Sequence, residues 1–260
     1  MSKSAERIHI NGILYDKEIL KTDLVRPSLL TVDSNSNTLY FSFISKDDEN
    51  YKSARLDLNT KQFNTIDDVV GGYAHAADQK TGDVYIGCDD GLYKYDPITN
   101  KTEFIGEKGG NILSIFYKDV LYYTKLGTLR FLHTFTNGEA SRCLELQDLE
   151  VENFCIDNED MMFFVNDNGI YGQKKGTYHA TLYEGLPDDY AECLTADVNG
   201  VVHVCYRGKG IFKINKETAC IEKVADLGKD FGATATFDKD NNIVYADATR
   251  VIRLVPTVDV

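Results

Sequence analysis

The sequence predicts an all-β protein that folds as a six-bladed β-propeller. One phrase occurs six times along the 260 residues: an apolar stretch, a polar turn and a second strand that in most copies carries Tyr or Phe. The turn positions 33, 78, 117, 157, 197 and 238 are separated by 45, 39, 40, 40 and 41 residues. A period near forty in a β-rich chain is typical of propeller blades, each too small to bury its apolar face alone.

The six phrases also define the order of the blades. We expect one domain over residues 1–260, because no Ser-, Pro- or Gly-rich linker interrupts the repeat. The innermost strands are expected at Ser28–Asp33, Ala74–Asp78, Leu113–Tyr117, Phe154–Asp157, Leu194–Asp197 and Thr234–Asp238. The blades are expected at about 28–69, 71–107, 111–146, 151–185, 189–227 and 232–258, the last completed by a strand at 13–20.

The second half of each blade is predicted to add two more strands. Residues 91–104 and 210–224 share one frame, in which a short strand, an Asp or Asn turn and another strand follow each other. The alternation of side chains along Leu92–Asp96 is the period-two pattern of a half-buried strand. Four strands per blade follow from this frame.

The last repeat is too short for four strands, since it ends after a third strand at Val251–Val255. The segment Ile13–Leu20 precedes the first blade and has a strand-like pattern. We expect it to supply the outermost strand of the final blade, because pairing the two chain ends closes the ring and covers a sheet edge.

The net charge of −13 argues against nucleic acid or an anionic membrane surface as a partner. No apolar run approaches the roughly 20 residues that a membrane span needs. The start, Met1–Arg7, has no apolar core for a secretory signal. Either the protein is cytoplasmic, or a natural signal has been removed.

Two cysteines are predicted to face each other in the fifth blade. Cys193 and Cys205 are equally distant from Asn199, where the hairpin turn is centred. Directly opposed residues on adjacent strands have Cβ atoms about 4.5–5.5 Å apart, slightly wider than the disulfide optimum of about 3.8 Å. The sequence is compatible with a disulfide and equally with a pair of buried free thiols.

Metal and catalytic patterns are mostly missing. Two segments, Asp33–Asn37 and Asp238–Asn242, resemble the start of a calcium loop but lack its glycine and its final glutamate. We interpret both as hairpin turns. The five His show no zinc-type pairing, and neither a nucleophile elbow nor a phosphate-binding glycine loop occurs. We therefore expect no catalytic residue, no metal and no cofactor.

Residues just before the innermost strands are expected to ring the central channel. They are mixed in chemistry, with aromatic rings for stacking and a few polar groups for orientation, which suits a flat conjugated ligand. The alternative is that the aromatic residues only plug the channel. The candidate ligand-binding set is Arg26, Tyr73, His75, Asn111, Asn153, Phe154, Tyr190, Glu192 and Phe231.

The chain resembles the insect ommochrome-binding proteins from about residue 10 to 255. The likeness lies in Tyr15–Asp23, Arg26–Ser28, Thr38–Ser42, Tyr85–Gly87, Asp90–Tyr93 and Leu121–Lys125. The resemblance implies a secreted haemolymph or tissue carrier of ommochromes, which are phenoxazinones derived from tryptophan. Members usually carry a signal peptide, so Met1–Arg7 departs from the pattern, and the protein is cytoplasmic if that start is native.

The wider relatives include metal-dependent lactonases of the gluconolactonase and regucalcin type. Asn111, Asn153 and Glu192 could superficially hold their divalent ion. However, Arg26–Ser28 offers no carboxylate, and the Asn-Gly pair typical of these enzymes is absent at Asn153. A protein-binding platform has no positive evidence. We therefore expect a non-enzymatic, monomeric carrier of a small planar aromatic ligand, with lactonase activity as the alternative.

Overall fold

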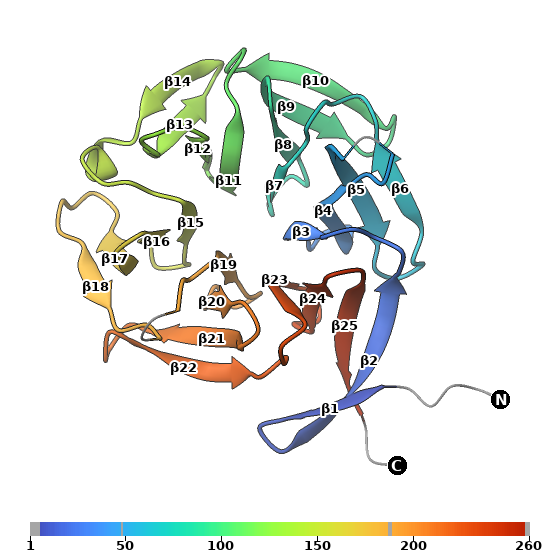
Figure 1. The fold of residues 1–260 in the computed structure, drawn as a ribbon. Coiled ribbons are helices and arrows are strands. Elements are labelled where there is room, and N and C mark those ends of the chain that lie inside the picture. Colours follow the sequence, from blue (N-terminus) through green and yellow to red (C-terminus); the bar gives the residue numbers. More distant parts are fainter. Residues whose placement is uncertain (1–5, 48, 187–188, 258–260) are drawn as a thin grey trace.

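A computed structural model describes residues 6–47, 49–186 and 189–257. Within these ranges, 25 strands form six antiparallel sheets around one axis (Figure 1). The prediction of an all-β, six-bladed propeller is confirmed. The first strand of each repeat lies innermost, so six strands from distant parts of the sequence surround the axis (Figure 1).

Five of the sheets have four strands, and the sixth has five. Blade 1 holds β3 (Ser28–Asp33), β4 (Thr38–Ile44), β5 (Tyr51–Asp57) and β6 (Phe63–Ile66); blade 2 holds β7 (Ala74–Ala77), β8 (Val84–Cys88), β9 (Gly91–Asp96) and β10 (Lys101–Gly106); blade 3 holds β11 (Ile112–Lys118), β12 (Val120–Lys125), β13 (His133–Thr136) and β14 (Glu139–Arg142); blade 4 holds β15 (Asn153–Ile156), β16 (Met161–Asn166), β17 (Gly169–Lys174) and β18 (Thr181–Tyr183); blade 5 holds β19 (Cys193–Ala196), β20 (Val202–Tyr206), β21 (Gly210–Asn215) and β22 (Cys220–Ala225); blade 6 holds β23 (Phe231–Phe237), β24 (Ile243–Asp247), β25 (Val251–Pro256), β2 (Ile13–Lys21) and β1 (Arg7–Ile10).

Blade 6 joins the two ends of the chain, as the sequence predicts. β2 pairs antiparallel with β25, from Tyr15 opposite Pro256 to Lys21 opposite Val251. Across this seam Nε of Arg253 donates to Glu18 at 2.8 Å. The short edge strand β1, which the sequence analysis did not predict, extends the sheet outward (Figure 1). The ring therefore has no open seam between its first and last blades.

Apolar side chains fill the spaces between neighbouring blades. Between blades 6 and 1, for example, Leu39 and Phe41 pack in one cluster with Val244 and Val251, and all four are essentially inaccessible to solvent. Burial of apolar surface contributes about 25 cal/mol per Å². Because the face of each blade is covered only by its neighbours, the closed ring is the unit that is stable.

An aspartate ends the innermost strand in most blades and shapes the turn that follows. Oδ1 of Asp78 accepts the backbone N–H of Lys80 at 2.9 Å, and its Oδ2 accepts the Thr81 hydroxyl at 2.9 Å. Capping of this kind satisfies turn amides that would otherwise lack partners. The same pattern occurs at Asp33, Asp157, Asp197 and Asp238. The interpretation of the two calcium-like segments as hairpin turns is confirmed.

The described residues contain one short 3₁₀ helix, η1 (Leu144–Leu146), between blades 3 and 4. No helix in these residues is long and apolar enough to cross a membrane.

Candidate ligand cavity on the propeller axis

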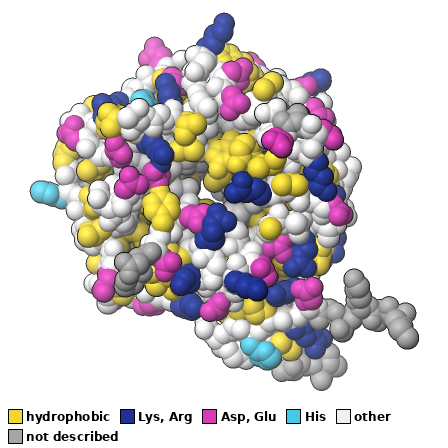
Figure 2. Space-filling model, viewed as in Figure 1, with side chains coloured by type: hydrophobic (Ala, Val, Ile, Leu, Met, Phe, Trp, Pro, Cys, Tyr) yellow, Lys and Arg dark blue, Asp and Glu magenta, His cyan; other side chains and the backbone are white. Residues whose placement is uncertain are grey.

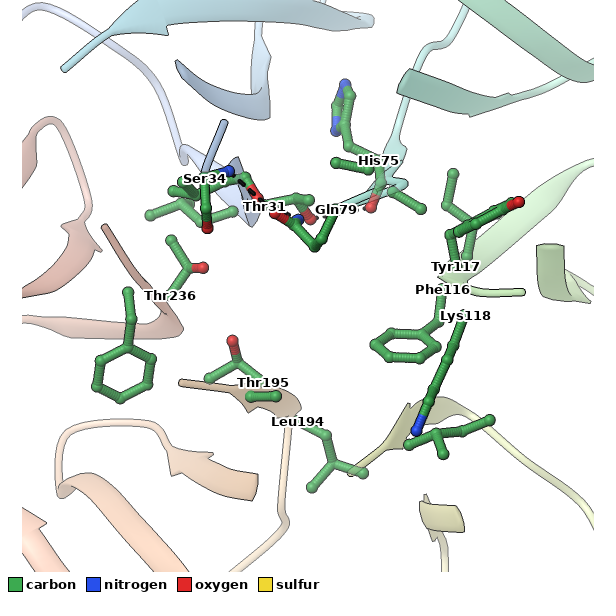
Figure 3. A pocket seen from close by; sticks show the side chains of 18 of the residues that line it. Thr31, Ser34, His75, Gln79, Phe116, Tyr117, Lys118, Leu194, Thr195 and Thr236 are labelled. Carbon is green, nitrogen blue, oxygen red and sulfur yellow. Dashed lines mark hydrogen bonds between the residues drawn. The ribbon is translucent and has the colours of Figure 1, made fainter. Parts of the chain in front are cut away.

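A cavity of about 590 Å³ lies on the propeller axis and is lined by every blade. Figure 3 shows it from close by. On the face of the ring seen in Figure 2, the centre is hollowed, and hydrophobic side chains and charges of both signs surround the hollow. One lining residue from each blade, in blade order, is Thr31, Gln79, Phe116, Ile156, Thr195 and Thr236.

Small side chains on the innermost strands create the space. β7 carries Ala74, Ala76 and Ala77, and β19 ends in Ala196. All four alanines line the cavity. Where six strands converge on one axis, short side chains leave room that large ones would fill. A volume in the range of about 300–1,000 Å³ is typical of a site for a small organic molecule.

The two sides of the cavity differ in chemistry. The ring of Phe116, from blade 3, projects toward the centre (Figure 3). It is half-buried and packs edge-on against Phe154 at a centroid distance of 6.0 Å. Opposite it, Thr195 and Thr236 direct their side chains into the cavity (Figure 3). One side thus offers an aromatic ring and the other offers hydroxyl groups.

Two of these hydroxyls are available to a ligand. Thr31 already donates to the carbonyl of His75 at 2.9 Å. The hydroxyls of Thr195 and Thr236 make no hydrogen bond to any residue that the structure describes. A hydroxyl can both donate and accept, so these two groups can bind carbonyl or amino edges of a ligand.

His75 belongs to the predicted set and lines the cavity, but its ring points away from the centre (Figure 3). The imidazole is buried, with Nε2 lying 3.0 Å from the hydroxyl of Ser53 in the neighbouring blade. Burial lowers the pKa of His75 to about 3, so the ring is neutral at neutral pH. The ring of His75 therefore joins two blades and does not face the cavity.

Asn153 and Phe154 also belong to the predicted set and line the cavity. Oδ1 of Asn153 accepts the backbone N–H of Leu194 at 2.9 Å, which ties blade 4 to blade 5. Phe154 packs against both Phe116 and Tyr122, with ring centroids 6.0 and 5.1 Å apart. Through these contacts, both residues hold neighbouring parts of the cavity wall in place.

The other six predicted residues, Arg26, Tyr73, Asn111, Tyr190, Glu192 and Phe231, are not among those that line the cavity. They lie where the innermost strands begin, whereas the cavity reaches the strand starts only in part, as at Ala74, Asn153 and Cys193, and extends to the turns at the far ends of the strands. That these six residues bind a ligand stays a prediction.

Three of the six come together from blades 1, 2 and 5. Burial raises the pKa of Tyr73 to about 12, and the nearby Glu192 adds to this shift while Arg26 opposes it. The Tyr73 ring packs edge-on against Tyr51 at 4.6 Å. Glu192 forms an ion pair with Arg207, whose Nε lies 2.8 Å from the carboxylate.

The remaining three differ from one another in burial and contacts. Phe231 is buried in the core and packs against Tyr245 at 6.0 Å, whereas Tyr190 is 46% exposed. The backbone carbonyl of Asn111 accepts the N–H of Leu126.

Sequence reasoning missed the residues that face the cavity most directly: Phe116, Lys118, Thr195 and Thr236. They belong to the repeated strand and turn, which we interpreted as structural. One signal in the sequence could have identified Lys118. The third repeat is the only one of the six without an aspartate at its turn marker, Tyr117, and the strand register aligns the next residue, Lys118, with the aspartates of the other repeats.

Two of the residues considered for a lactonase metal have other partners in the structure. Among the described residues, no group of three or more His, Cys, Asp or Glu side chains is arranged to hold a metal ion. Glu192 is engaged by Arg207, and the side-chain oxygen of Asn153 accepts from Leu194. Two of the three side chains that sequence reasoning proposed for a divalent ion are therefore already bonded to other residues of the protein.

The predicted opposition of two cysteines is seen in the strand register. Cys193 on β19 lies directly opposite Cys205 on β20. Both are buried, and both are free thiols.

Comparison with known proteins agrees with this description. No family model matches the chain. The ommochrome-binding protein of Manduca sexta is 29% identical over 252 residues, which cover 95% of this chain and 90% of that protein. A gluconolactonase from Xanthomonas campestris superposes with a TM-score of 0.72 at 10% identity, covering 98% of this chain and 96% of the other. Regucalcin from Agrobacterium tumefaciens superposes with a TM-score of 0.69 at 13% identity, covering 93% and 94%.

The two solved structures are too distant in sequence to indicate more than the fold. The similarity to the Manduca protein runs along almost the whole of both chains. The chain is therefore similar in sequence to an insect ommochrome-binding protein and shares the six-bladed propeller fold of gluconolactonases and regucalcin.

Proposed function

We propose that this protein is a non-enzymatic carrier that binds a planar aromatic pigment of the ommochrome class in its axial cavity. The observation that carries the proposal is the cavity of about 590 Å³, into which one aromatic ring and two available hydroxyls project. The full-length similarity to an ommochrome-binding protein supports the choice of ligand class.

The residues of the cavity account for binding in physical terms. A fused-ring chromophore that stacks on Phe116 gains about 25 cal/mol for each Å² of apolar surface buried, and about 0.5–1.5 kcal/mol from the aromatic contact. Thr195 and Thr236 would hydrogen-bond the carbonyl and imine edges of the ring system. Because these hydroxyls have no partner among the described residues, binding breaks no hydrogen bond that the protein makes with them.

The same residues favour binding over catalysis. The aspartates at the cavity turns have their carboxylates engaged by turn amides, as at Asp78 and Asp197. His75 is neutral, and its ring points away from the cavity. A general base needs a titratable group within reach of the reacting atoms, and these groups face other residues of the fold.

The proposal includes secretion, which the resemblance to ommochrome-binding proteins implies. It is checked by immunoblotting body fluid and tissue cytosol of the source organism. Detection in the cytosol alone would contradict an extracellular carrier.

A titration with xanthommatin tests the binding proposal. We expect a shift of the visible absorption band that saturates at one pigment per protein. Phe116→Ala should weaken binding about tenfold or more, because it removes the stacking surface. Phe104→Ala is the matched control, since Phe104 lies on the outer strand of blade 2 and is 45% exposed. No shift with the unmodified protein, or equal loss in both variants, would contradict the proposal.

A further inference from the structure

We propose that Lys118 anchors an acidic group of the ligand, so that the cavity selects planar aromatic compounds with a carboxylate at one edge. This inference rests on the proposed carrier function and specifies its ligand. The evidence comes from the position of Lys118 in the repeat, from its contacts and from the charges around it.

Lys118 stands where other blades place a turn aspartate. In blade 1, Val32 pairs with Leu39, and Asp33 follows it. In blade 3, Tyr117 pairs with Leu121, and Lys118 follows it. The equivalent residues Asp33, Asp78, Asp157 and Asp197 all cap their turns with the carboxylate.

A lysine has no acceptor and cannot cap turn amides. Blade 3 makes a tighter turn instead, in which Lys118 pairs with Val120 and Asp119 adopts a left-handed conformation with φ 61°. The need to form a turn therefore does not explain why residue 118 is a lysine.

The Lys118 side chain runs along the cavity wall beside Phe116 (Figure 3). Its Nζ donates to the carbonyl of Asp157 and lies 3.1 Å from the carboxylate of Asp160. An ammonium group has three donors, and these contacts use two of them. One N–H thus remains for a ligand.

Lys118 is also the least solvated cation at the cavity. Its side chain is 25% exposed, compared with 78% for Lys80 and 47% for Lys239, which line the same cavity. Charges with less water around them interact more strongly with an incoming anion. Lys80 is moreover paired with Asp119 at 2.6 Å.

The negative charges of the cavity wall restrict where an acidic group can bind. Asp78, Asp119 and Asp197 line the cavity. A ligand carboxylate placed beside these residues would be repelled, whereas one beside Lys118 would form a charge-assisted hydrogen bond. With the ring on Phe116, that acidic edge points toward Nζ of Lys118 beside the β15–β16 turn of blade 4, and the opposite edge faces Thr195 and Thr236 (Figure 3).

The test compares two ligands that share a ring system: xanthommatin, which carries carboxylates, and a neutral phenoxazinone without them. Lys118→Met should weaken xanthommatin binding about tenfold and leave the neutral compound within about twofold. Lys118→Arg should retain most of the affinity for xanthommatin. Asp160→Asn should strengthen xanthommatin binding a few-fold, because it removes the carboxylate that competes for Nζ; Asn tolerates the left-handed conformation at this position, φ 60°.

Lys175→Met is the matched control. Lys175 lowers the pKa of the same two carboxylates, Asp119 and Asp160, but it does not line the cavity. The Lys175→Met substitution removes one positive charge near Lys118, and we expect it to change the affinity for either ligand by less than twofold.

The outcomes separate this inference from the proposed function. Equal weakening of both ligands by Lys118→Met, or of neither, would overturn the role of Lys118 while leaving the carrier intact. Failure of the unmodified protein to bind either compound would overturn both proposals. Thermal melting of each variant shows whether a loss of binding comes from unfolding.

Discussion

The neighbouring strands β7 and β11 occupy equivalent places at the axis, yet they use their residues differently. In blade 2, two polar side chains at the cavity are hydrogen-bonded to blade 1: His75 contacts Ser53, and Gln79 donates to the carbonyl of Val32 at 2.8 Å. In blade 3, Phe116 and Lys118 face the cavity (Figure 3). Of these two repeats, the one that departs from the common pattern is thus the one whose side chains face the cavity.

Both strands reach the axis only in a closed ring. Opening the ring should therefore reduce the stability of the protein more than any other change. Deletion of residues 1–20 removes most of β2 and leaves β25 without its partner. We expect the melting temperature to fall by more than about 10 °C, because blades that are not enclosed lose the burial that stabilises them. Wild-type melting of the truncated protein in calorimetry would contradict the closure by β2.

The turn acid of blade 2 and the turn residue of blade 3 should differ in their effect on stability. Asp78→Ala leaves a turn amide without its acceptor and should cost about 2 kcal/mol. Asp119→Asn removes an exposed pair with Lys80 and should leave the free energy of unfolding almost unchanged. Urea denaturation of both variants measures the difference. Equal costs would mean that blade 3 depends on its turn acid as much as blade 2 does.

His75 should affect stability least at neutral pH, and its effect should appear only when the pH is lowered. Its pKa in the folded protein is about 3, below the value of about 6.5 for an unfolded histidine. The unfolded chain therefore takes up the proton first, and stability falls as the pH drops from 6.5 toward 3. Between pH 7 and 5 this group should cost about 2 kcal/mol, at about 1.4 kcal/mol per pKa unit.

Comparison with His75→Gln isolates this contribution. His203, whose pKa burial also lowers, is unchanged in the variant, so its effect cancels in the difference. If the wild type and the variant lose the same stability between pH 7 and 5, His75 is not held neutral by the fold.

Most of the fold could be predicted from the sequence, but less of the cavity could be. The period near forty and the short last repeat depend on local pattern, so the six blades and the pairing of β2 with β25 could be predicted. The cavity depends on the sum of side-chain sizes from six strands. Ala74, Ala76 and Ala77 leave a space only because their counterparts do not fill it.

The starts of the innermost strands were chosen as the site because all blades meet there. They do meet, as the proximity of Arg26, Tyr73 and Glu192 shows. Blades converge equally at both ends of a channel, however, and no local pattern in the sequence shows which end is hollow.

The pairing of β2 with β25 also determines at which stage of synthesis the ring can close. β2 precedes the strands of the other five blades in the sequence, but its partner β25 follows all of them. β2 must remain unpaired at this edge until β25 has been made, and contacts so distant in sequence form slowly. Under the proposed carrier function, the cavity can therefore bind its ligand only after β25 has been made, and a chain that stops before β25 would leave this edge of β2 uncovered.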